Sequence, residues 1–168
     1  MKGAGIVAFA FGVPHTLDAN TLIAALAVSE SRRLDGDLPV FTQLDIQFAP
    51  ELNIPVTRCT EEPEYPPPTM RICREAVYWA TRERINVLII VAAGPHVWRC
   101  ERDLEEAIRD AKARIVIHVC KNIFRPQYRE RWFSPESTQP RARSFWAFWP
   151  WEIVLRLMPM FLYKRVAS

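Results

Sequence analysis

A chain of 168 residues, 49% of them hydrophobic, is long enough to bury one ordinary core, and two independent domains would be crowded. Its 22 basic and 19 acidic side chains leave a formal net charge of +3, so the chain lacks the strong basic excess that is typical of nucleic-acid binding. No apolar run approaches the roughly 20 residues that cross a bilayer. We therefore expect a soluble protein and consider nucleic acid an unlikely partner.

The cysteines carry information about the compartment and about metals. Cys59, Cys73, Cys100 and Cys120 form no CxxC pair, and two of them fall inside predicted helices. Spacing of this kind does not suggest disulfides or a zinc site, so we predict reduced thiols that are buried or half-buried, and no metal. A reducing compartment points to a cytoplasmic protein, with membrane association as an alternative.

Five segments are apolar on both faces, as buried parallel strands are. They are Gly5–Gly12, Pro39–Ile46, Ile54–Arg58, Asn86–Ala93 and Arg114–Cys120. The first segment follows Lys2 in the manner of a secretory leader, but it is short and runs into a turn at Pro14. We therefore interpret it as a strand.

Three helical patterns alternate with these strands. One runs from Asp18 to about Arg33, a second begins near Thr69, which we expect to cap it, and a third covers His96 to Ala113. This order predicts a Rossmann-like α/β fold of three layers, with a mainly parallel sheet of about five strands and helices on both faces. Only residues 47–53 separate the second strand from the third. The third strand is therefore very short, antiparallel or at the sheet edge.

We predict one α/β domain over residues 1–168, with its core in 4–120 and two further segments. Residues 121–143 form a basic, proline-broken, irregular excursion, and 144–168 form an aromatic helical tail in which Pro150 starts a helix and Pro159 kinks or ends it. The tail has three interpretations: burial against the sheet edge or a second subunit, peripheral membrane contact through 144–163, or stacking on single-stranded nucleic acid.

Ligands of parallel α/β sheets bind beyond the carboxyl ends of the strands. Polar residues and turns that the sequence places there make up the predicted ligand site: Gly12, His15, Thr42, Glu62, Thr69, Arg71, His96 and Arg99. His118, by contrast, alternates within a strand, so we predict that it is a buried core residue.

His96 is the strongest single candidate among these residues. The Gly94-Pro95 turn puts its imidazole at a helix start, with Arg99 one turn further on the same face. Arg99 and the turn amides would hold an anion or phosphate, and His96 would be the catalytic acid or base. The alternative is a capping or partly buried histidine, with Arg99 paired to Glu62 or to solvent. No GxGxxG, GxxxxGK[ST] or GxSxG motif is present.

The stretch Val87–Arg99, a hydrophobic strand followed by small residues and H-x-x-R, resembles the YdcF, SanA and ElyC family of small α/β proteins. Gly12 after the first strand and the Thr-bearing start of Thr69–Ala76 are similar to that family too. The resemblance implies a Rossmann-like fold, a small nucleotide-like ligand, with S-adenosylmethionine as one option, and a link to envelope metabolism. The alternative is a non-enzymatic envelope or assembly factor that docks through its tail.

Overall fold

The sheet has five strands, all parallel, in the order β3-β2-β1-β4-β5. The computed structural model describes residues 3–33, 37–61 and 67–166. The strands are β1 (Ala4–Ala8), β2 (Val40–Thr42), β3 (Val56–Arg58), β4 (Val87–Val91) and β5 (Val116–Val119). This is the strand order of a doubly wound α/β fold, in which the chain leaves β1 and β4 toward opposite faces.

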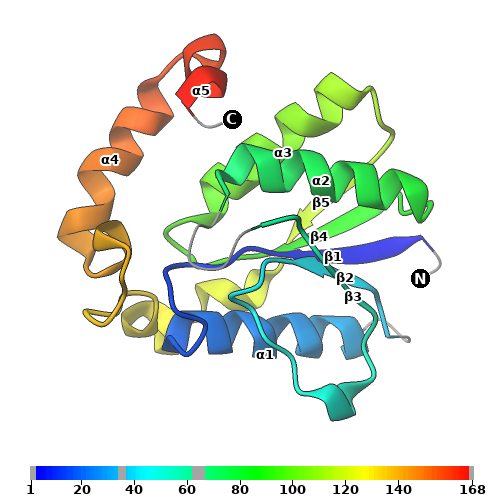
Figure 1. Ribbon diagram of the computed structural model, residues 1–168, viewed down its shortest axis with the longest axis horizontal. Helices are drawn as coiled ribbons and strands as arrows, with labels where there is room; N and C mark the ends of the chain where they lie inside the picture. Colours follow the sequence, from blue (N-terminus) through cyan, green and yellow to red (C-terminus); the bar gives the residue numbers. More distant parts are fainter. Residues whose placement is uncertain (1–2, 34–36, 62–66, 167–168) are drawn as a thin grey trace.

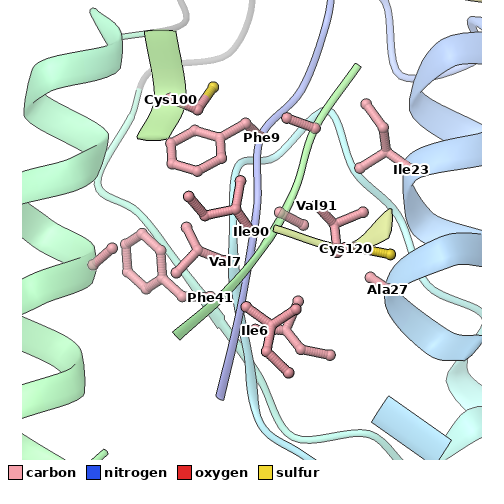
Figure 2. Close-up of a cluster of buried hydrophobic side chains, with 14 of the residues drawn as sticks. Ile6, Val7, Phe9, Ile23, Ala27, Phe41, Ile90, Val91, Cys100 and Cys120 are labelled. Carbon is pink, nitrogen blue, oxygen red and sulfur yellow. The ribbon is translucent and has the colours of Figure 1, made fainter. Parts of the chain in front are cut away.

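Helices cover both faces of the sheet, which confirms the predicted three layers. The helices α2 (Thr69–Arg82) and α3 (Val97–Ala111) lie on one face, and α1 (Asp18–Arg33) lies on the other (Figure 1). The core fills both gaps: Figure 2 shows Val7 and Phe41 on the side of the green helices, and Ile23 and Ala27 on α1. The four cysteines are buried, as predicted, and free.

The strands are shorter than the sequence pattern predicts. Because β2 ends at Thr42 and β3 begins at Val56, residues 43–55 are left for the connection, which suffices for a parallel crossover. The Arg58 guanidinium stabilises this connection by donating to the carbonyl oxygens of Gln43 and Ile46. Of the alternatives for the third strand, the short strand at the sheet edge is confirmed, and it is parallel.

The prediction that His118 is a core residue is wrong. His118 lies on the edge strand β5 and is exposed, as is Val116, which points to the same face two residues earlier. Apolar residues alternate along β5 because this strand pairs with β4. The helix α1, however, contacts β1 and β4, so the face of β5 that carries Val116 and His118 is left uncovered.

The predicted helices begin and end close to the observed bounds, with one error in capping. Thr69 is the first residue of α2, and the capping position belongs to Pro68, which has no side-chain donor or acceptor. The stripe of α2 that the sequence predicts to face inward, Ile72, Ala76 and Trp79, is buried. Tertiary packing of this stripe therefore compensates for the missing cap.

The excursion 121–143 is more regular than predicted, because it contains three short 3-10 helices. These are η2 (Lys121–Phe124), η3 (Pro126–Arg131) and η4 (Pro140–Ala142), and a further one, η1 (Pro50–Leu52), follows β2. Ile123, Trp132 and Ala142 are buried in the main core, so the excursion packs onto the body of the protein.

The tail forms α4 (Phe145–Leu157) and α5 (Met160–Val166), which run past the carboxyl edge of the sheet (Figure 1). The prediction that Pro150 starts a helix is wrong: α4 begins five residues earlier because the Ser144 hydroxyl accepts from the amide of Ala147. Pro159 does separate the two helices, as predicted. Within the residues described, no helix is long and apolar enough to cross a membrane.

Candidate functional site

A cavity of about 630 Å³ lies at the carboxyl edge of the sheet, between the loops that leave β1 and β4. This is the topological switch point, where doubly wound folds bind their ligands. Strand-end residues such as Phe11 and Gln43 and the starts of α2 and α3 form one side. The opposite wall comes from η4, α4 and α5, so residues distant in sequence close the cavity.

Four of the predicted site residues line this cavity together. Gly12 follows β1, Thr69 opens α2, and His96 and Arg99 stand at the start of α3. The turn at 94–96 and the loop after β1 therefore border the same cavity.

The other predicted residues lie elsewhere or outside the described residues. His15 is exposed and does not line the cavity. The Thr42 hydroxyl is buried and donates to the carbonyl oxygen of Ala8 at 3.0 Å, which ties β2 to β1. Arg71 lies on the surface, where it pairs with Glu75 at 3.2 Å and donates to the carbonyl of Thr60. Glu62 belongs to the residues that the structure does not describe.

A buried asparagine on α1 holds the loop after β1 in place. Asn20 accepts from the amide of Phe11 and donates to the carbonyl oxygens of Gly12 and Pro14. Gly12 has φ of +88°, and a Cβ there would stand 2.8 Å from the Ser137 hydroxyl. The loop therefore needs a glycine at this point, both for its backbone conformation and for the close approach of the η4 segment.

The His96 ring is buried beside the cavity and engaged by Arg99. Its Nδ1 accepts from Nε and Nη2 of Arg99, at 3.3 and 3.0 Å, so the ring proton sits on Nε2. Burial, and next the charge of Arg99, hold the pKa of His96 well below its ordinary value. The ring is therefore neutral at pH 7, and Nε2 is the atom that remains to contact a ligand as a donor. A role for His96 as acid or base stays a prediction.

The turn amides at this point do not have the role that the sequence predicts. The amides of His96 and Val97 both donate to the carbonyl oxygen of Ala93, at 2.8 and 2.9 Å. Since they close the turn, they are not available to an anion, and the positive charge of the site must come from side chains.

Arg99 has a buried counter-ion that the sequence analysis does not predict. Its Nε lies 3.5 Å from Oε2 of Glu152 in α4, whose side chain is 1% exposed, and Arg156 approaches the same carboxylate at 3.5 Å. Oε2 of Glu152 accepts no hydrogen bond among the described residues. One carboxylate thus faces two guanidinium groups at moderate distance, which leaves net positive charge next to the cavity.

A second arginine of the cavity, Arg141, stands at its exposed rim. Its guanidinium lies 3.9 Å above the ring of Trp151, and burial and the charge of Arg99 lower its pKa. The lining contains no Asp or Glu among the described residues, while Phe11, Phe148 and Trp151 supply aromatic surface. The cavity therefore combines two cations with apolar walls.

Four cavity or supporting residues are missing from the predicted ligand site. Gln43 lines the cavity, and its side-chain oxygen accepts from the amide of Ala10. Its neighbour Thr42 is the predicted residue, and adjacent strand residues face opposite ways. Arg141, Glu152 and Tyr163 come from the last part of the chain. One available signal is that Glu152 is the single acidic residue between positions 137 and 168.

No cluster of three or more potential metal ligands occurs in the described part of the chain. Comparison with protein-family models, curated proteins and solved structures finds no match. The likeness to the YdcF, SanA and ElyC family consequently stays a prediction.

Proposed function

We propose that the protein binds a small anionic molecule that joins a phosphate to a planar or apolar group, such as a nucleotide, in the cavity at the switch point. The observation that carries this proposal is the lining of the cavity, which holds two arginines, Arg99 and Arg141, and no Asp or Glu among the described residues. The carboxylate of Glu152, which pairs with Arg99, lies outside the lining and is shared with Arg156. Burial, and next the charge of Arg99, lower the pKa of Arg141, and an anion between the two guanidinium groups would offset the repulsion from Arg99.

Each part of such a ligand has a counterpart in the cavity. The phosphate would contact Arg99 and Arg141 and accept from Nε2 of His96, because guanidinium groups match phosphate oxygens in geometry and charge. The planar group would lie against the aromatic wall of Phe148 and Trp151. A volume of about 630 Å³ is within the usual range for a small-molecule site.

S-adenosylmethionine, which the resemblance implies, fits this lining less well. Its sulfonium and ammonium groups are cations, and the described lining has two arginines and no carboxylate to receive them. Of its charged groups, only the carboxylate would be matched. We therefore expect nucleotides and pyrophosphate to bind more tightly than S-adenosylmethionine.

Thermal unfolding with added compounds tests the proposal. Adenosine 5′-diphosphate or pyrophosphate at a hundred times its dissociation constant should stabilise the fold by about 2.7 kcal/mol, which raises Tm by about 5–10 °C for a chain of this size. Adenosine, which lacks the anion, should give a much smaller shift. Absence of a shift with every phosphate compound would contradict the proposal.

Two arginine variants test where the anion binds. Arg141→Met removes a rim cation that belongs to no ion pair among the described residues, so it should weaken pyrophosphate binding by about tenfold or more while the chain still folds. Arg71→Met removes a surface arginine outside the cavity and serves as the control, with binding unchanged. Equal binding by the two variants would show that the anion binds elsewhere.

A further inference from the structure

The helix α4 is apolar on two opposite faces, and only one of them is covered. Phe148 and Leu155 are buried against the body of the protein. Trp146, Ile153 and Leu157 follow one another at helical spacing on the opposite side, where Trp146 is 82% and Leu157 is 79% exposed. In α5, Phe161 is a further exposed aromatic residue. A helix with apolar residues on two opposite faces is ordinarily covered on both, so the exposed second face of α4 indicates a binding surface.

The charged residues around this exposed face indicate what kind of partner it binds. Residues 137–168 contain five basic side chains and one acidic side chain, Glu152, which is buried. Arg143 just before α4 and Arg165 in α5 are exposed. Lys164 is paired with Glu106 and Asp110 of α3. The exposed polar groups of the segment itself are thus cationic, which favours an anionic partner and disfavours a second copy of the same face.

We infer that α4 and α5 dock side-on on an anionic lipid surface through the face that carries Trp146, Ile153, Leu157 and Phe161. The body of the protein holds α4 by its buried face, so the helix lies along the surface with its other apolar face turned outward. Exposed Trp, Leu and Phe side chains beside arginines are the combination that interfacial helices use.

The attachment of the tail to the body makes this face rigid. Arg102 of α3 donates to the carbonyl oxygen of Leu155 at 2.9 Å and stacks over the Tyr163 ring at 3.9 Å. The Tyr163 hydroxyl donates to the buried carboxylate of Asp103. Because both helices are fixed to α3, the docking face requires no folding step on contact, and the loss of entropy on binding is small.

Vesicle co-sedimentation of the full chain tests the inference. We expect binding to vesicles of phosphatidylcholine with phosphatidylglycerol, weaker binding to phosphatidylcholine alone, and weaker binding at high salt. The double variant Trp146→Ser, Leu157→Ser should lose about a hundredfold or more of the partition coefficient, because it removes two large apolar side chains from the lipid contact.

The matched control is the double variant Tyr78→Ser, Val116→Ser. It removes two apolar side chains with exposures of 71% and 57% from α2 and β5, and should bind vesicles like the wild type. Circular dichroism would check that both variants fold. Absence of vesicle binding, equal losses in the two double variants, or a dimer in sedimentation that only Trp146→Ser, Leu157→Ser abolishes would each overturn the inference. Nucleotide binding is not involved in any of these measurements.

Discussion

Lowering the pH below 6.5 should destabilise the folded chain through His96. Burial and the charge of Arg99 hold the folded pKa of this ring well below the ordinary 6.5. The unfolded chain therefore binds more protons than the folded one between the two values, so stability rises with pH in that window and falls on acidification.

The size of the effect follows from the unfolded state. At pH 5.5 an exposed histidine with a pKa of 6.5 is about ten-elevenths protonated, while the folded ring, whose pKa is lower, is protonated to a smaller extent. The difference amounts to at most about 1.4 kcal/mol of unfolding free energy relative to pH 7.5, and this limit is reached if the folded ring stays neutral. The loss continues until the pH reaches the folded pKa.

The measurement compares the wild type with His96→Gln by urea unfolding at pH 5.5 and 7.5. Glutamine keeps an oxygen that can accept from Arg99 and does not titrate. Asp103, whose pKa is raised by burial, is present in both proteins and cancels in the difference. The wild type should lose more unfolding free energy than the variant on acidification, by up to about 1.4 kcal/mol. Equal losses would show that His96 is not a neutral, desolvated ring.

Three further substitutions test the links between cavity and tail. Tyr163→Phe should destabilise the chain by about 1–3 kcal/mol in urea unfolding, because it leaves Oδ2 of the buried Asp103 without its donor while Arg102 still donates to Oδ1. Unchanged stability would show that the Tyr163 bond contributes little. Gly12→Ala should lower the free energy of unfolding by more than about 1 kcal/mol, since the φ of +88° at Gly12 disfavours a side chain. Gly94→Ala, at a position with an ordinary φ, should lower it by less. Glu152→Gln should lower the free energy of unfolding by up to about 3 kcal/mol, because Arg99 loses its counter-ion. For the same reason it should tighten pyrophosphate binding, measured by calorimetry. A variant that lost both stability and affinity, or gained both, would contradict the assignment of Glu152 as the counter-ion of Arg99.

Local pattern predicts the sheet and its helices well, because apolar periodicity reports directly on burial. The bounds of α1 and the buried stripe of α2 follow from spacing alone. The ends of strands are less predictable: apolar character continues past Thr42, where pairing has already stopped, and β5 looks like a central strand although one of its faces is open.

The sequence predicts only those site residues that follow strands or lie at helix starts. His96, Arg99, Gly12 and Thr69 come directly after strands or at helix starts, and a parallel sheet gathers such positions at one edge. Arg141 lines the cavity from η4 in the excursion, and Glu152 of the tail pairs with Arg99 beside the cavity. No local pattern specifies either contact. A single acidic residue in an otherwise apolar and basic segment indicates burial with a partner, but it does not identify the partner as Arg99.

The wall formed by residues 139–163 has a consequence for the order in which the protein is synthesised. All five strands, as well as His96 and Arg99, leave the ribosome before Gln139, so a nascent chain can assemble the sheet while the cavity is still an open edge. The cavity is enclosed only when Tyr163 reaches Asp103, after all five strands have been synthesised. A stop codon placed between positions 139 and 163 would therefore leave the strands in the chain and remove part of the wall of the cavity.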